Sequence, residues 1–133
     1  MILSSLAISS CATRYHVAAV TMVNMGPLEI ASAGIKDGES YLTDCGYLSP
    51  NGKGQATNVV MDISIPETIT VVYGTNRSRF WAEKHQHTLT VRTNGKPKKS
   101  KDTWLVVEVN AKANKVTADL LSRTEFFRKY ENY

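Results

Sequence analysis

The chain has 133 residues, of which 42% are hydrophobic and 21% charged, and its formal net charge is +4. This composition excludes a disordered chain, and the length suits one domain with one modest core. The small basic excess favours acidic partners or anionic headgroups without choosing between them. After the N-terminal run, no stretch reaches the roughly 18 apolar residues of a membrane-spanning helix.

The N-terminal run is uncharged and mostly apolar up to Cys11. Residues 6–11 (Leu-Ala-Ile-Ser-Ser-Cys) resemble a bacterial lipobox, in which an aliphatic and two small residues precede the lipidated cysteine. We therefore predict a lipoprotein signal remnant at residues 1–10 and a single β-rich globular domain at residues 11–133. A lipid on Cys11 would tether the domain to the cell envelope. Ala12, rather than aspartate, follows the cysteine, which indicates the periplasmic face of the outer membrane.

Two alternatives to this interpretation stay open. No Lys or Arg precedes Cys11 and the apolar run is short, so either the true start lies upstream of Met1 or residues 1–10 are an ordinary first strand. Without lipid, Cys11 could form a disulfide with Cys45 in an oxidising compartment. With lipid, Cys45 is left alone beside Asp44, where it is expected to be a small buried residue.

The rest of the chain is predicted to form short strands separated by turns. In chain order, the strands are expected at residues 15–23, 30–35, 59–65, 69–73, 88–93, 104–109 and 116–121. Residues 50–54 have the composition of a turn, 66–67 interrupt two strands, and 110–115 suit a hairpin. In the strand at 59–65, alternation predicts that Val59, Met61, Ile63 and Ile65 share one face.

Two helices are expected among these strands, at residues 77–85 and 124–133. In the second, Ser122 is a candidate N-cap, and Glu125 follows at the spacing of a capping box. The predicted fold is mainly β, a single antiparallel β-sandwich or curved-sheet domain with one or two short helices.

No catalytic motif is recognisable, so we expect neither an enzyme nor a cofactor. His85 and His87 would share a face on a strand, but a zinc site needs three or four ligands, so no metal site is expected. The glycine-rich residues 51–54 lack the spacing of a phosphate-binding loop. Nucleic acid is not an expected partner, because no aromatic side chains are interleaved with the basic ones.

Two segments are candidates for binding a partner protein. Trp81 lies near Arg77 and Arg79, and an exposed Trp flanked by Arg is typical of a binding hot spot. Four lysines crowd a turn between two predicted strands; they are Lys96, Lys98, Lys99 and Lys101. That lysine loop is either a solvated, solubilising loop or a docking surface for an acidic protein face or anionic lipid.

Three parts of the chain together resemble a known group of proteins. Residues 58–73 look like a strand, an Ile-Pro break and a second strand that ends in Val-Val-Tyr. Residues 15–20, followed by Asn24, look like the first strand of that pattern, and residues 104–109 with 115–118 look like its last hairpin. The pattern resembles small bacterial lipoproteins of unknown-function families found beside type VI secretion lipase effectors.

The resemblance implies an immunity protein, an inhibitor that binds and blocks a sibling cell's secreted phospholipase in the periplasm. It implies no catalytic residue. The alternative is a structural or assembly lipoprotein of the outer membrane without a toxin partner, and a weak hydrolase or ligand-binding domain is a third hypothesis.

Overall fold

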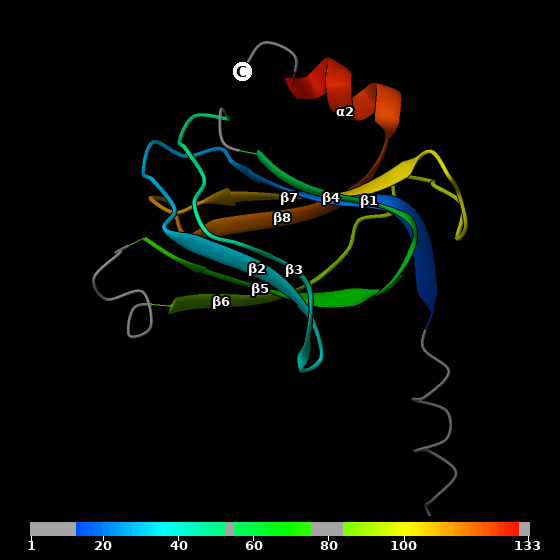
Figure 1. Cartoon of the computed structure of the whole chain (residues 1–133), viewed down its shortest axis with the longest axis horizontal. Helices are drawn as coiled ribbons and strands as arrows, with labels where there is room; N and C mark the ends of the chain where they lie inside the picture. Colours follow the sequence, from blue (N-terminus) through cyan, green and yellow to red (C-terminus); the bar gives the residue numbers. More distant parts are fainter. Residues whose placement is uncertain (1–12, 53–54, 76–83, 131–133) are drawn as a thin grey trace, which may run out of the picture.

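A computed structural model of the chain describes residues 13–52, 55–75 and 84–130, with only the backbone described at residues 45 and 58–62. Two four-stranded sheets pack face to face, and one short helix lies on the outside of the first sheet (Figure 1). Strands make up 62% of the structure, which confirms the predicted mainly β fold. The predicted signal remnant at residues 1–10, Cys11, Arg77, Arg79 and Trp81 lie outside the described residues.

The first sheet has the strand order β4-β1-β7-β8. Its strands are β1 (Arg14–Asn24), β4 (Gln55–Pro66), β7 (Thr103–Asn110) and β8 (Lys115–Ser122). β1 is antiparallel to β4 and parallel to β7, and β7 and β8 form the predicted hairpin. Of the two central strands, β1 is the longer, and it is rich in small and β-branched residues that suit burial on both faces.

The second sheet has the order β3-β2-β5-β6, and all its neighbouring strands are antiparallel. Its strands are β2 (Ser32–Asp37), β3 (Ser40–Cys45), β5 (Thr68–Gly74) and β6 (Lys84–Thr90). Only Glu67 separates β4 from β5, so the chain passes from one sheet to the other at the predicted break.

The core lies between the two sheets and follows the period-two alternation of the strands. In β5, Ile69, Val71 and Tyr73 point inward and are at most 1% exposed. From the first sheet, Met22, Leu105 and other apolar side chains meet them. This single contiguous cluster fits a chain of this length.

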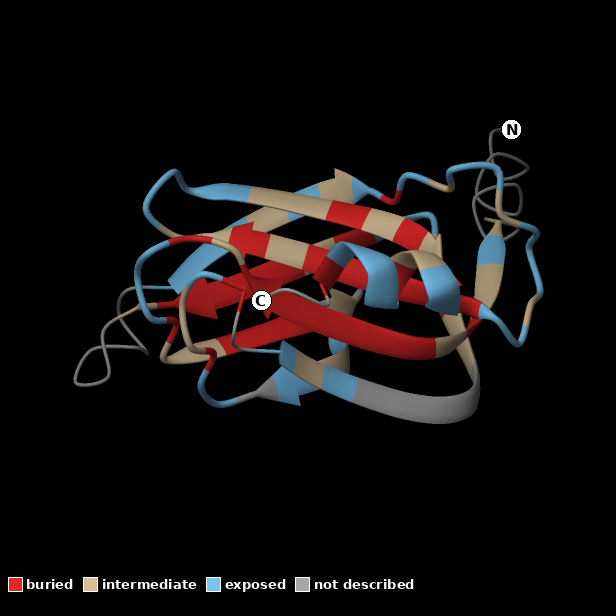
Figure 2. Cartoon of the chain, turned by 90° about the horizontal axis from the view of Figure 1, so that it is seen from above, coloured by how far each residue is buried: buried red, intermediate tan, exposed pale blue. Residues whose placement is uncertain are grey.

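The helix α2 (Arg123–Tyr130) lies on the outer face of the first sheet, over its central strands, so β1 and β7 are largely buried on both faces (Figure 2). Phe126 and Tyr130 pack on a second cluster that includes Trp104 and Val106. The predicted capping box is confirmed. The Ser122 hydroxyl accepts from the Glu125 amide at 3.1 Å, and the Glu125 carboxylate accepts from the Ser122 amide at 2.8 Å.

The prediction of a helix at residues 77–85 is wrong at its last two residues, whereas residues 77–83 lie outside the described part of the chain. Lys84 and His85 begin strand β6, where they pair with Gly74 and Tyr73 of β5. The rings of Tyr73 and His85 stack with their centroids 4.9 Å apart. Pairing with a neighbouring strand therefore decides the conformation here, which local sequence pattern could not indicate.

Two further differences concern strands. β3 was not predicted; it forms because Gly38, with a φ of 61°, allows a tight turn that folds residues 40–45 back onto β2. β4 is longer than predicted, and its register against β1 shifts between Val17 and Ala19, which pair with Ile63 and Val59. The side chains of Val59 and Met61 lie outside the described part of the structure, so the alternation expected along residues 59–65 stays a prediction there.

The strand directions give the sandwich two different ends. We call the end where β1 begins, at Arg14, the proximal end; the connections at residues 38–39, 67 and 91–102 lie there. We call the end where β1 stops, at Asn24, the distal end. The connections at residues 25–31, 46–54, 75–83 and 111–114 join strands at that end.

Candidate protein-binding surface

Asn24, the last residue of β1, is fully buried and organises the distal end. Its side-chain nitrogen donates to the carbonyl oxygens of Leu28 at 2.7 Å and Leu48 at 3.1 Å. Its side-chain oxygen accepts from the amide of Gly26 at 3.1 Å. One amide group thus satisfies three backbone groups from two separate connections, 25–31 and 46–54.

Backbone hydrogen bonds also join these two connections directly. Ile30 and Leu48 exchange a pair of bonds, with N–O distances of 3.1 and 2.9 Å. The amide of Asn51 donates to the carbonyl of Gly26 at 2.9 Å, and that of Gly52 donates to Asn24 at 2.7 Å. Since the bonds cross between the connections, the two segments form one fixed surface.

This surface exposes two large apolar side chains, and a buried apolar residue lies near each of them in sequence. Leu28 is 45% exposed and Tyr47 is 41% exposed, while Ile30 and Leu48 beneath them are almost fully buried. Two of the four large hydrophobic side chains that the described structure exposes thus lie at the distal end. Aromatic side chains held on a fixed surface are the residues that most often carry protein-binding energy. We call residues 25–31 and 46–52 the distal platform.

The distal platform continues to the end of β5. The amide of Ala31 donates to the carbonyl of Gly74 at 2.8 Å. Gly74 and Lys84, which flank the segment with the predicted binding residues Arg77, Arg79 and Trp81, both lie at this end. Those three residues are themselves outside the described part of the chain.

A partly buried polar contact closes the sandwich on the other side of the distal end. The Tyr73 hydroxyl donates to the side-chain oxygen of Asn114, which also lies 2.9 Å from Nε2 of His87. Burial raises the pKa of Tyr73, so its hydroxyl remains a donor at neutral pH. Asn114 has a φ of 50°, a turn conformation that asparagine tolerates. The contact fastens the β7–β8 turn to the second sheet.

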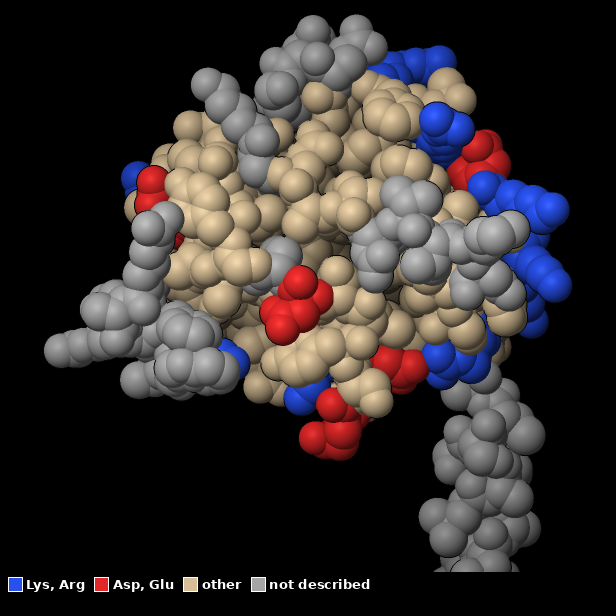
Figure 3. All heavy atoms as spheres, in the orientation of Figure 1, with Lys and Arg blue, Asp and Glu red and all other residues tan. Residues whose placement is uncertain are grey.

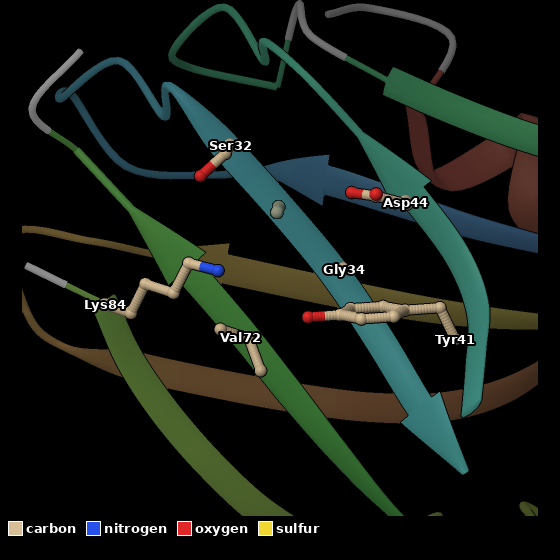
Figure 4. A pocket seen from close by; sticks show the side chains of 7 residues that line it. Ser32, Gly34, Tyr41, Asp44, Val72 and Lys84 are labelled. Atoms are coloured by element: carbon tan, nitrogen blue, oxygen red, sulfur yellow. The ribbon is translucent and has the colours of Figure 1, made fainter. Parts of the chain in front are cut away.

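The outer face of the second sheet carries a groove of about 190 Å³ that lies between β3 and β6. Its lining residues are Ser32, Ala33, Gly34, Tyr41, Asp44, Val72 and Lys84. Figure 4 shows the Tyr41 ring lying across β2 at Gly34 and the Lys84 side chain reaching from β6 across β5.

The groove has polar walls of opposite charge. A Cβ atom on Gly34 would come within 2.7 Å of the Tyr41 ring, so the absent side chain is what lets the ring lie down. Asp44 and Lys84 supply an acid and a base near the distal end of the sheet. The volume is below that of most small-molecule sites, and the groove is better suited to receive a side chain of a docked protein.

The lysine loop lies at the proximal end, away from the distal platform. Lys96 forms an ion pair with Glu125 at 2.7 Å, and that contact is the largest cause that lowers the pKa of Glu125 to about 2. Lys98, Lys99 and Lys101 are exposed. The two candidate binding segments of the sequence are therefore separated, because the 75–83 and 91–102 connections join strands at opposite ends.

The residues that build the distal platform are not evident from the sequence. Asn24 was noted only as part of a pattern, although the Asn-Met-Gly-Pro run at 24–27 carries a turn signal. Leu28 and Tyr47 had no local signal, because their exposure depends on how the two connections pack against each other.

His85 and His87 do share a face of β6, as predicted, and both stack on Tyr73. Among the described residues, no group of three or more His, Cys, Asp or Glu side chains is arranged to hold a metal ion. Within the same residues, no helix is both long and apolar enough to cross a membrane. Comparison of the chain with family models, curated proteins and solved structures finds no match.

Proposed function

We propose that the chain is an envelope lipoprotein that acts by binding a protein, as an immunity protein that sterically blocks a secreted phospholipase effector. The domain would be tethered through Cys11 at the periplasmic face of the outer membrane. The distal platform, with the neighbouring segment that contains Arg77, Arg79 and Trp81, would cover the active site of the effector.

The observation that carries the proposal is the difference between the two ends of one sandwich. The predicted lipidation site precedes β1 at the proximal end, whereas the fixed surface with exposed Leu28 and Tyr47 lies at the distal end. A tethered inhibitor needs this arrangement, because its binding surface must point away from its point of attachment.

The rigidity of the distal platform supports tight binding. Ordering loops and side chains on association costs free energy, roughly 0.5–1.5 kcal/mol for each immobilised flexible side chain. Here Asn24 and the Ile30–Leu48 bonds already fix both connections before any partner arrives. The groove with Asp44 and Lys84, beside the platform, offers charged contacts that would set orientation.

The proposal is tested with phospholipases encoded by genes that flank the gene of this chain. The full chain should inhibit one of them stoichiometrically and should protect cells in which that enzyme is directed to the periplasm. Replacing Leu28 and Tyr47 together with Ala should weaken the complex by about 2 kcal/mol, roughly 30-fold. The matched control is Phe127→Ala, since Phe127 is 50% exposed but lies on α2.

Substituting Arg77, Arg79 and Trp81 with Ala should also weaken that complex, by several kcal/mol if they form the hot spot. Unchanged inhibition by both sets of variants would remove the distal end from consideration. If no flanking phospholipase is bound or inhibited, a structural lipoprotein without a toxin partner becomes the better description.

Tethering is tested separately by metabolic labelling with a fatty-acid analogue. The wild-type chain, expressed with any natural upstream leader, should take up label and fractionate with membranes, whereas Cys11→Ser should do neither. Equal labelling of both proteins would contradict lipidation at Cys11.

A further inference from the structure

The lysine loop is held firmly against the first strand. The amide of His16 donates to the carbonyl of Lys98 at 2.7 Å, and the amide of Ser100 donates back to His16 at 3.3 Å. These bonds form a short parallel bridge between His16 and Lys99. The loop therefore pairs with the start of β1, on the side where β7 pairs with the rest of that strand.

Further contacts fix both sides of the loop. The side-chain nitrogen of Asn94 donates to the carboxylate of Asp119 at 3.0 Å and to the carbonyl of Leu120 at 3.1 Å. After the loop, the carbonyl of Asp102 accepts from the amide of Arg123 at 2.9 Å. The positions of the lysine Cα atoms are thus set by the fold.

Within the described part of the chain, some cations of the proximal end are paired with carboxylates and others are not. Arg14, Arg92 and Lys96 each form an ion pair, with Asp37, Asp119 and Glu125 respectively. Lys98, Lys99 and Lys101 are exposed and form no salt bridge with the described residues. Figure 3 shows Lys and Arg side chains gathered on this side of the molecule.

These three ammonium groups lie close to the predicted point of attachment. Cys11 precedes Arg14 by three residues, which span at most about 11 Å. His16, to which Lys98 is bonded, is only two residues further along β1. An anionic surface acts on charges within about one Debye length, roughly 10 Å, and the stretch of chain after Cys11 is short enough to let a membrane at Cys11 approach these lysines to that distance.

We propose that Lys98, Lys99 and Lys101 bind the headgroups of anionic phospholipids in the membrane to which the domain is tethered. This inference rests on the proposed tethering, but not on the effector as partner. A lipid anchor alone fixes position and leaves the domain free to rotate. A second, electrostatic contact beside the anchor fixes the orientation as well, with the proximal end on the membrane and the distal platform pointing away.

The inference is tested by sedimentation of the purified, unlipidated full chain with lipid vesicles. Vesicles of phosphatidylcholine that contain about one third phosphatidylglycerol should bind the chain at low salt, and vesicles of phosphatidylcholine alone should not. High salt should abolish the binding, because screening weakens attraction between exposed charges.

Two charge-matched variants locate the contact. Lys98→Gln/Lys99→Gln should lower the partition onto anionic vesicles about 25-fold, at roughly fivefold for each lysine. The control, Lys112→Gln/Lys115→Gln, also lowers the net charge from +4 to +2, but changes exposed lysines at the distal end. It should change the partition less than about twofold.

Equal losses in the two variants would show that net charge alone drives binding, and would overturn the inference. So would equal binding to neutral and anionic vesicles. If Lys98→Gln/Lys99→Gln weakens effector inhibition but leaves vesicle binding unchanged, the loop binds an acidic protein face instead. The vesicle assay contains neither the effector nor the lipid anchor. Its result can therefore be interpreted even if the chain inhibits no phospholipase or takes up no fatty-acid label.

Discussion

At the scale of single residues, the buried side-chain amide of Asn24 joins the two connections of the distal platform. Its three hydrogen bonds reach the backbone of Gly26, Leu28 and Leu48. A shorter or a charged side chain at this position would lose at least one of these bonds. A carboxylate in its place would set an oxygen against two carbonyl oxygens. Position 24 therefore determines the shape of the distal platform without being exposed itself.

Asn24→Ala should destabilise the domain and loosen the distal platform. Each backbone group left buried without a partner costs about 1–3 kcal/mol, so the free energy of unfolding should fall by at least about 2 kcal/mol. Asn110→Ala is the control; its side-chain oxygen accepts from the amide of Ala113, a partly exposed contact worth about 1 kcal/mol. Urea unfolding of both variants gives the comparison, and equal losses would contradict the role assigned to Asn24.

The carboxylate of Glu125 makes the stability of the fold depend on pH. The ion pair with Lys96 and the hydrogen bond from the Ser122 amide hold its pKa at about 2, against 4.5 for a free glutamate. Because the folded state binds the proton more weakly, this group stabilises the fold above pH 4.5. That contribution is lost as the pH falls toward 2.

Glu125→Gln should therefore lower stability at neutral pH, and the difference from wild type should shrink between pH 4.5 and 2. The effect should be modest and weaker in high salt, since the Glu125 side chain is 44% exposed and solvent screens its charge. Thermal unfolding followed across this pH range measures it. Glu39→Gln, which removes a carboxylate from the exposed β2–β3 turn, is the matched control.

At the scale of elements, α2 depends on the sheet beneath it. Its eight residues are too few for a stable isolated helix, so its capping box and packing must supply the stability. The Phe126 ring lies 4.8 Å from that of Trp104, between ring centroids, and the Tyr130 hydroxyl donates to the carboxylate of Glu108. In return, α2 covers apolar residues of β1 and β7.

Phe126→Ala should detach α2 and cost about 3–5 kcal/mol, the range for removing a buried aromatic ring. Phe127→Ala should cost much less, because the Phe127 side chain is half exposed. Hydrogen exchange at the amides of residues 123–130 should accelerate in the first variant only. Acceleration in both would mean that α2 is held by the exposed ring as well.

At the scale of the whole molecule, the two ends of the sandwich differ in chemistry. The proximal end carries the exposed lysines of the loop, and the distal end carries Leu28 and Tyr47 on a base fixed by Asn24. The strand directions separate these surfaces by the length of β1, 11 residues, which is roughly 35 Å for an extended strand. A contact at one end therefore leaves the other accessible.

Binding to anionic vesicles should slow hydrogen exchange at residues 96–102 and leave residues 25–31 and 46–52 unchanged. The reason is that Lys98, Lys99 and Lys101 lie within residues 96–102, whereas residues 25–31 and 46–52 contain no lysine. Mass-spectrometric exchange with and without vesicles measures both regions in one experiment. Slower exchange at the distal platform would reverse the proposed orientation.

Much of the fold was accessible from the sequence. The strands β1, β5, β7 and β8 were predicted nearly at their observed bounds, because each carries a β-branched or alternating pattern between turn residues. The capping box at Ser122 and Glu125 was predicted because its geometry is fixed by three residues of local spacing.

The candidate site was much less accessible. Lys98 and Lys99 were recognised as a cluster, but their position beside His16 depends on a contact across more than 80 residues of chain. Leu28 and Tyr47 lie in connections with no repeating pattern, so nothing local distinguishes an exposed side chain from a buried one. His85 was assigned to a helix because its partner in β5 could not be foreseen.

The sequence by itself determined the mainly β class, the positions of the strongest strands and the capped C-terminal helix, since these follow from periodicity and spacing within a few residues. Only the tertiary structure decided that β3 is a strand, that β6 begins as early as Lys84, that one sheet is covered by α2 and that the lysines and the distal platform lie at opposite ends. Strand order and direction arise from pairing between distant segments, and such pairing leaves no mark in a short stretch of residues.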